Sequence, residues 1–138
     1  MTPPRLRVAL LAASAGGVLG ALARWALTEG FPTTDGFPTS TFWINVVGCA
    51  LLAALPALDP VRRTPWLGVF LGTGVLGGFT TMSTASEQTV VLLEHDRTGT
   101  AVLYAGGTVL AALTVTWLVS RWSTPLQRAL LERDEADE

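Results

Sequence analysis

The chain has 138 residues, of which 49% are hydrophobic and 14% are charged, and its formal net charge is −2 at neutral pH. Soluble domains carry about a quarter charged residues, so a globule of this composition would expose large apolar patches and aggregate. The same figures exclude disorder, and the lack of a basic stripe argues against nucleic-acid binding. A single cysteine, Cys49, excludes an internal disulfide framework and a cysteine zinc cluster. What remains is a small integral membrane protein.

Four stretches without charged residues predict four transmembrane helices. They are Val8–Ala23 (extending through Arg24 to about Leu27), Thr39–Leu58, Thr64–Ser86 with an apolar continuation to Leu93, and Thr98–Ser120. Each is close to the ~20 mostly apolar residues that a helix needs to cross a bilayer. The sequence therefore predicts an all-α integral membrane fold. It has one transmembrane domain over residues 1–123 and a polar, acidic C-terminal tail over residues 124–138.

The distribution of arginines predicts the orientation of these spans. With four spans, the N-terminus, the second connection and the C-terminus share one side of the membrane. That side holds seven arginines, whereas the opposite side holds only Arg97. Because cytoplasmic loops are enriched in positive charge, we expect a multi-pass protein of the plasma membrane with both termini in the cytoplasm.

The third predicted span has the composition of an interrupted helix. Residues 72–84 contain four glycines and then a dense run of hydroxyl side chains: Thr80, Thr81, Ser83 and Thr84. A Gly77-Gly78 pair at mid-membrane depth is a poor helix centre, so we expect the helix to break near it. A break frees carbonyl oxygens, which coordinate hard cations such as sodium. Single hydroxyls commonly bond back to their own helix, but four in five positions favour a functional role.

Strongly polar residues also occur inside the predicted spans, where they are costly and usually face a cavity or a partner. Arg24, Asn45 and the hydroxyl run together suggest a site for a small anion, because guanidinium supplies charge and amides and hydroxyls donate hydrogen bonds. Each polar residue also has a structural interpretation: snorkelling for Arg24, an inter-helix bond for Asn45, and a headgroup-level carboxylate for Glu87. Tyr104 and Thr108 share one face of the fourth span, as a pore lining or a packing face.

Glycines spaced four residues apart indicate close packing between helices in lipid. The pairs Gly16/Gly20 and Gly68/Gly72 are interpreted as packing positions alone. A third pair, Gly74/Gly78, lies within the glycine-rich part of the third span and accompanies the predicted break.

Three segments match the pattern of a known family. Residues 16–25 follow G-G-x-x-G-A-x-x-R in the first helix, and residues 41–48 follow T-x-x-x-N-x-x-G in the second. Residues 72–87 contain most of G-x-x-G-G-x-T-T-F-S-T-F-x-x-E in the third. The chain, except for its acidic tail, thereby resembles the fluoride-specific ion channels (the Fluc or CrcB family). The resemblance implies a four-helix subunit of an antiparallel dimer, in which two narrow pores export fluoride passively and lower cytoplasmic fluoride.

The resemblance also implies roles for individual residues. A sodium ion, structural rather than transported, would be held at the dimer centre by main-chain oxygens of Gly77 and Thr80. Asn45 would be the pore amide and Arg24 the arginine at the vestibule. The rest of the fluoride pathway would consist of Thr81, Met82, Ser83, Thr84, Glu87, Tyr104 and Thr108. The implied partners are fluoride, sodium, membrane lipid and a second subunit.

Two features depart from the family pattern. The family carries phenylalanines, whose positive ring edges contact fluoride, where this chain has Met82 and Ala85. The arginine bias of seven against one is also too strong for a subunit that inserts in both orientations. Both features fit one half of a heterodimer, paired with an oppositely oriented homologous subunit that brings the phenylalanines.

Other functions are less favoured. A non-conducting structural subunit of such a heterodimer is an alternative, because a degenerate pore can still support its partner. A small four-helix multidrug exporter would need a carboxylate in the first span, and Val8–Ala23 has none. An enzyme is not expected, since no nucleophile-base-acid set or phosphate loop is present and the single histidine, His95, lies in a connection.

Overall fold

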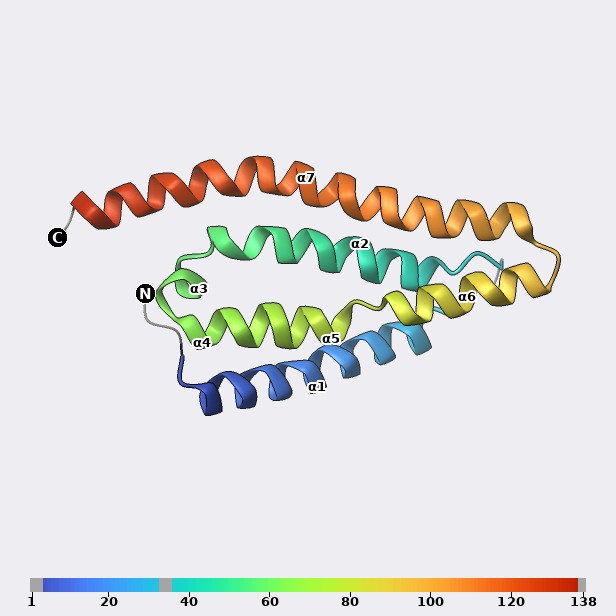
Figure 1. The fold of residues 1–138 in the computed structure, drawn as a ribbon, viewed down its shortest axis with the longest axis horizontal. Coiled ribbons are helices and arrows are strands. Elements are labelled where there is room, and N and C mark those ends of the chain that lie inside the picture. The colour runs from blue at the N-terminus through green and yellow to red at the C-terminus, as the bar shows by residue number, and fades with distance from the viewer. Residues whose placement is uncertain (1–3, 33–35, 137–138) are drawn as a thin grey trace.

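The computed structural model describes residues 4–32 and 36–136, with side chains up to residue 124, and every regular element in these ranges is helical (Figure 1). Within these ranges, four helical segments are long and apolar enough to cross a membrane: Leu6–Gly30, Thr39–Ala57, Pro65–Glu94 and Thr98–Thr124. The predicted all-α fold and the number of four spans are confirmed. The protein is therefore a multi-pass membrane protein.

The first, second and fourth spans are regular. Helix α1 (Leu6–Gly30) extends beyond the predicted span at both ends, and α2 (Thr39–Ala54) continues into the single turn η1 (Leu55–Ala57). The connection that follows contains a short helix, α3 (Asp59–Arg63). The last helix, α7 (Thr98–Ala136), runs on through the predicted tail, so no break in the backbone marks a boundary at residue 123.

The third span consists of four consecutive pieces. They are α4 (Pro65–Gly68), the wide π-helical η2 (Val69–Leu76), α5 (Gly77–Phe79) and α6 (Met82–Glu94). The helix is interrupted at Thr80 and Thr81, whose ψ angles of 154° and 115° are extended. The interruption thus lies after the glycine pair near which it was expected, and Gly77 itself is helical, with φ −65° and ψ −34°.

The glycines of the third span pack against α1 instead of breaking the helix. Helix α1 lies along η2 and α5, while α7 lies along α2 and α6 (Figure 1). A Cβ added to Gly20 would overlap the carbonyl oxygen of Val75, and one added to Gly78 would overlap that of Gly17. These contacts confirm the packing role of Gly16 and Gly20 and extend it to Gly74 and Gly78.

Gly68 and Gly72, the other glycine pair of the third span, pack less tightly. A Cβ at Gly68 or Gly72 would meet only side-chain carbons, at 3.7 Å and 3.5 Å, which is ordinary van der Waals contact. Backbone-to-backbone packing therefore runs along the face of η2 and α5 that lies against α1, from Phe70 to Gly78. This contact fixes the height of α1 relative to the third span.

The turn from α6 to α7 closes the end of the bundle opposite the start of α1 and the end of α7 (Figure 1). Asp96 adopts φ 57°, and the N–H groups of Asp96 and Arg97 donate to the carbonyls of Leu93 and Leu92 at 3.1 Å and 2.9 Å. This paired bonding is the Schellman arrangement, in which a left-handed residue reverses the chain just after a helix. It fixes Arg97 beside the C-terminal end of α6.

Candidate functional site

Asn45 of α2 holds the interruption in place. Its side-chain nitrogen donates to the carbonyl oxygen of Thr81 at 3.0 Å, and the Thr81 N–H donates back to the Asn45 oxygen at 2.8 Å. Both residues are buried, at 8% exposure. Because an unpaired backbone group in a lipid-embedded interior costs several kcal/mol, this two-way pairing is what makes an extended residue tolerable there. The Asn45 amide thus forms an inter-helix hydrogen bond, which is the structural role that the sequence suggested for it.

The Thr81 side chain begins the next helix. Its hydroxyl oxygen accepts from the backbone N–H of Thr84 at 3.1 Å, which is the N-cap bond of α6. The same hydroxyl donates to the Thr84 hydroxyl at 3.0 Å and lies 3.2 Å from the Ser83 hydroxyl. Thr81 therefore has its backbone and side chain fully engaged within the subunit.

Thr80 of the run, and two hydroxyls outside the run, bond back to carbonyls of their own helices. Thr80 donates to the carbonyl of Leu76, Ser86 to that of Met82, and Thr108 of α7 to that of Tyr104, at 3.0, 2.9 and 2.6 Å. This is the common behaviour of single hydroxyls in helices. The hydroxyl run is thus divided between helix back-bonding and the cap at Thr81.

The interruption diverts hydrogen bonds away from two main-chain carbonyls. In an unbroken helix the Gly77 carbonyl would accept from the N–H of Thr81, and the Thr80 carbonyl from that of Thr84. Those N–H groups donate instead to the Asn45 side chain and to the Thr81 hydroxyl. In the described part of the chain no group of three His, Cys, Asp or Glu side chains gathers around a metal position. Main-chain oxygens of this kind suit a hard cation such as sodium.

Arg24 approaches the same segment from α1. It is half-buried, and its Nε donates to the carbonyl oxygen of Gly78 at 3.3 Å. The helix continues past it to Gly30, so the side chain turns across to the third span instead of snorkelling to the membrane surface. On the opposite side, a Cβ at Gly48 of α2 would overlap the Thr80 methyl group, so this glycine lets α2 approach the interruption.

A second polar centre lies between α6 and α7. Tyr104 is completely buried, and its hydroxyl donates to the Oε1 atom of Gln88 at 2.7 Å. Ala85, Leu92 and Ala101 form a small core with Tyr104, and the rings of Phe37 and Phe42 pack against this core. The Phe37 ring meets Tyr104 edge to face, with 5.4 Å between centroids. Aromatic rings from the first connection and α2 therefore pack where the small Ala85 leaves room.

The structure does not bring all the predicted pathway residues together. Met82, Ser83 and Glu87 are exposed, and Met82 has 68% of its surface accessible. Thr81 and Asn45 are buried at the interruption, whereas Tyr104 and Thr108 are buried between α6 and α7. Gln88 was missed by sequence reasoning, although the last position of the pattern T-T-F-S-T-F-x-x-E, counted from Thr80, falls on Gln88 and not on Glu87.

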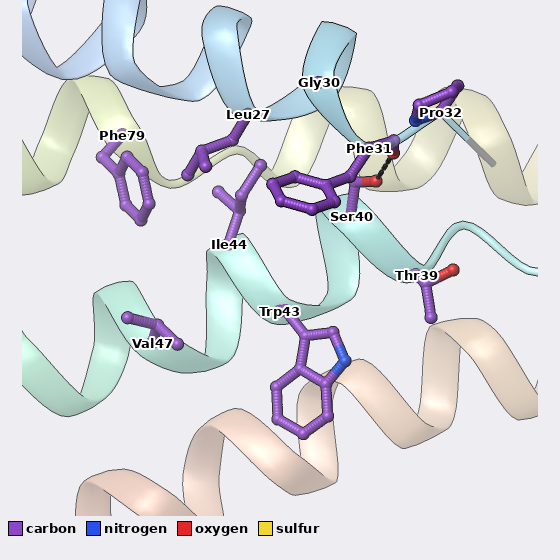
Figure 2. Close-up of a pocket in the computed structure, with 10 residues that line it drawn as sticks. All are labelled: Leu27, Gly30, Phe31, Pro32, Thr39, Ser40, Trp43, Ile44, Val47 and Phe79. Atoms are coloured by element: carbon purple, nitrogen blue, oxygen red, sulfur yellow. Dashed lines mark hydrogen bonds between the residues drawn. The ribbon is translucent and has the colours of Figure 1, made fainter.

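One cavity lies between α1, α2 and α5 and is mainly apolar. It has a volume of about 600 Å³, and Figure 2 shows Leu27, Phe31, Ile44 and Phe79 around it. The Ser40 hydroxyl at its rim donates to the Phe31 carbonyl. No charged side chain lines this space, so it offers nothing that recognises an ion.

Another cavity, of about 470 Å³, lies beside α6, at the end of the bundle where α6 turns into α7, and its lining surface is also mainly apolar. Its lining includes charged, amide, imidazole and hydroxyl side chains, namely Thr84, Glu87, Gln88, His95 and Arg97. Gly36 and Pro38 of the first connection form its opposite wall. The polar groups of this cavity come mainly from one face of a single helix.

Four spans with an interrupted helix and buried polar groups define a polytopic membrane protein with the architecture of channels and transporters. Residues 11–120 match the family described as CrcB-like protein, camphor resistance (CrcB), and the chain belongs to this family. It is 41% identical to fluoride-specific ion channel FluC 2 of Nocardia farcinica, over 91% of this chain and 94% of the relative. It is 42% identical to FluC 1 of Streptomyces coelicolor, over 76% and 70% of the two chains.

A relative from a third organism is similarly alike. Fluoride-specific ion channel FluC 1 of Halobacterium salinarum is 38% identical over 86% of this chain and 95% of its own length. These comparisons confirm the family resemblance that the three sequence segments indicated. Since these relatives are named as ion channels, the expectation that the chain is not an enzyme is confirmed as well.

Proposed function

We propose that this chain is a subunit of a fluoride channel that carries fluoride passively out of the cytoplasm and so lowers its cytoplasmic concentration. The observation that carries the proposal is the match, over most of both chains, to relatives named fluoride-specific ion channels. The buried Asn45 and the half-buried Arg24, both beside the interruption, support it, since amide and guanidinium groups suit a small anion.

A structural sodium ion at the interruption is part of this proposal. Its ligands would be the main-chain oxygens of Gly77 and Thr80, whose helical donors are diverted to Asn45 and Thr81. The ion would neutralise these partial negative charges and stabilise the bend without being transported. The proposal predicts that sodium raises thermal stability more than potassium does, because the smaller cation fits a tighter oxygen cage.

The functional unit that we propose is an antiparallel dimer with an oppositely oriented homologous subunit. Met82 and Ser83 follow directly after the interruption and are exposed on a single subunit, so a partner is needed to enclose a path along them. The arginine bias supports a fixed orientation of this chain, with both termini in the cytoplasm. Two relatives from one organism, FluC 2 and FluC 3 of Streptomyces avermitilis, show that one organism can carry several such chains.

A non-conducting role in the dimer is the second candidate. It is favoured by Met82 and Ala85, because neither side chain offers the positive ring edge of an aromatic residue to an anion. Ala85 is moreover buried in an apolar cluster within the subunit. In this case the chain would hold a conducting partner in place and complete only one pore.

Fluoride efflux from liposomes separates these candidates. The purified chain is reconstituted at high lipid dilution, alone and with a homologous partner from the same organism, and efflux is followed with a fluoride electrode. Rapid efflux from the chain alone supports a self-sufficient channel and overturns the obligate heterodimer. Efflux only with the partner supports the heterodimer, and a pore substitution in this chain then shows whether its own path conducts. No efflux in either case overturns the channel proposal.

A further inference from the structure

We propose that the outer face of α7 binds one anionic phospholipid, with the headgroup phosphate on the Arg121 guanidinium and an acyl chain along the apolar side chains that precede it. This face is separate from the interruption, and its residues line neither of the two cavities. The site does not depend on the proposed channel function. Only the assignment of this lipid to the cytoplasmic leaflet rests on the proposed orientation of the chain.

The Arg121 side chain is held against the helix by an aromatic ring. Its guanidinium carbon lies 5.3 Å from the centroid of the Trp117 ring, which is a cation–π contact. Trp117 lies one turn earlier in α7, so the arginine turns back toward the membrane-embedded part of the helix, as helical side chains do. Both side chains are exposed. Because indole rings favour the headgroup layer, the contact holds the guanidinium at the depth of the lipid phosphates.

The Arg121 charge has no counter-ion within the described part of the subunit, where it forms neither a hydrogen bond nor an ion pair. The carboxylate described at this end of the bundle, Asp59, already pairs with Arg62 at 2.6 Å. Arg5 and Arg7, at the start of α1, are exposed at the same end. This end therefore attracts anions, and the planar guanidinium of Arg121 matches two oxygens of a phosphate group.

An apolar strip leads from Arg121 into the membrane. It consists of Trp117, Leu113 and Leu110, whose side chains are 59%, 63% and 66% exposed. Intervals of four, four and three residues place them on one face of the helix with Arg121. Eleven residues separate Arg121 from Leu110, which is about 16 Å along an α-helix. One leaflet contributes about 15 Å of the hydrocarbon core, so the strip has the length of one acyl chain.

The site lies where α7 is attached to the end of the second span. Two residues after Arg121, the Ser123 hydroxyl donates to the carbonyl oxygen of Ala53 at 3.0 Å. A lipid on the outer face of α7 at this level reinforces that attachment from the membrane side. Because a ligand that binds only the folded state stabilises it, binding should also raise the unfolding midpoint.

The test uses the full-length chain, delipidated in a non-ionic detergent. It is titrated with phosphatidylglycerol, which is anionic, with phosphatidylcholine, which is zwitterionic, or with glycerol phosphate, which has no acyl chain. Native mass spectrometry counts the bound lipid, and the unfolding midpoint is measured on the same samples.

The variants separate charge, shape and stacking. Arg121→Gln removes the charge, Arg121→Lys keeps the charge without the planar fork, and Trp117→Leu removes the stacking ring. Arg7→Gln is the matched control for charge, since it removes an exposed arginine at the same end of the bundle. Trp66→Leu is the matched control for the ring, because Trp66 packs edge to face on Phe70.

We expect the unmodified chain to bind phosphatidylglycerol at least about tenfold more tightly than phosphatidylcholine. Arg121→Gln should lower the affinity for phosphatidylglycerol about tenfold, and Arg121→Lys and Trp117→Leu about threefold each. Both controls should stay within about twofold of the unmodified chain. Without lipid, Arg121→Gln should unfold at the unchanged midpoint, because its side chain makes only an exposed contact.

Other results would overturn the inference. Equal affinities for the two lipids would reject an anionic headgroup site, and displacement of the lipid by glycerol phosphate would identify a site for free phosphate. If Arg7→Gln weakened binding as much as Arg121→Gln, the attraction would be diffuse. If Arg121→Gln did not fold, unchanged binding by Arg121→Lys and Trp117→Leu would reject the site. Fluoride efflux is not part of this readout, so the lipid site and the channel proposal fail or stand separately.

Discussion

Two polar regions of this subunit use similar side chains in different ways. At the interruption, the Asn45 amide pairs with the Thr81 backbone, and the Thr81 hydroxyl accepts from the Thr84 N–H and donates to the Thr84 hydroxyl. In the cavity beside α6, Gln88 and Thr84 each use one polar group internally and leave a donor over. Burial and polarity are therefore poor guides to a ligand site by themselves. The better guide is hydrogen-bonding capacity that the fold has fixed in direction and left unused.

This difference predicts different consequences of substitution. Removing a group whose partner is a buried backbone atom should destabilise the subunit, because the partner is left unpaired. Removing a donor that faces a cavity should change binding and leave stability nearly unaltered. Stability and ligand response, measured on the same variants, therefore test the comparison directly.

The largest effect is expected for Asn45→Leu. It leaves the N–H and carbonyl of Thr81 buried without partners, at about 1–3 kcal/mol for each group, so the variant should lose about 2–6 kcal/mol of stability. Thermal unfolding in detergent, with the folded fraction followed by size-exclusion chromatography, measures the loss. Asn45→Asp keeps the acceptor for the Thr81 N–H but sets a carboxylate oxygen against the Thr81 carbonyl in a buried site, so it should not restore the lost stability. If Gln88→Leu destabilises as strongly as Asn45→Leu, the distinction between the two regions is wrong.

Next in size is Gly20→Ala, which tests how α1 supports the interruption. The added methyl group would overlap the Val75 carbonyl and force the helices apart, at a cost of about 1–3 kcal/mol. Gly106→Ala in α7 is the matched control, because no atom lies within 4 Å of its added Cβ. That control should be neutral or stabilising by up to about 1 kcal/mol, since alanine favours helix more than glycine does. Equal unfolding midpoints for the two variants would contradict close packing at Gly20.

A smaller loss is expected for Thr81→Val, which removes the N-cap of α6 and keeps the side-chain shape. Loss of such a cap costs about 1 kcal/mol, and the Asn45 pairing to the Thr81 backbone remains in place. Thr89→Val on the same helix is the control, since its hydroxyl only bonds back to Ala85. A Thr81→Val loss as large as that of Asn45→Leu would show that the hydroxyl, and not the amide, maintains the interruption.

The sequence predicts the number of spans well, because charge-free stretches of the right length leave few alternatives. It also predicts that Asn45 and Thr81 matter, since an amide and a hydroxyl run are unusual in lipid. It predicts a break near Gly77-Gly78, and the extended residues, Thr80 and Thr81, follow that pair directly after Phe79, because Gly78 packs closely against Gly17 of α1 and stays helical. Tertiary contacts of this kind have no local signature.

The hydrogen bond between Gln88 and Tyr104 could not be predicted for a similar reason. It depends on Tyr104, which is 16 residues away in sequence and approaches only because α6 and α7 pack side by side. A lone glutamine in a helix is otherwise an ordinary surface residue. Conversely, Met82 and Ser83 were predicted from the family pattern, and the fold of one subunit leaves them exposed. Their role can be tested only with the second subunit present.

The smallest effect is expected for an ion pair whose carboxylate is exposed to water, in the connection between α2 and the third span. The Arg62 guanidinium, 2.6 Å from Asp59, lowers the pKa of that carboxyl below its usual value of 3.8. A group whose pKa is lowered by folding contributes stability above its unfolded pKa and loses it as the pH falls through the folded value. The unmodified chain and Asp59→Asn should therefore differ slightly in unfolding midpoint at pH 6 and converge as the pH falls through the lowered pKa of the folded Asp59 carboxyl. If Asp59→Asn lost as much stability as Asn45→Leu, access to water would not explain why the two polar contacts differ in strength. If the difference between Asp59→Asn and the unmodified chain grew on acidification, the Asp59 carboxylate would not be the stabilising group.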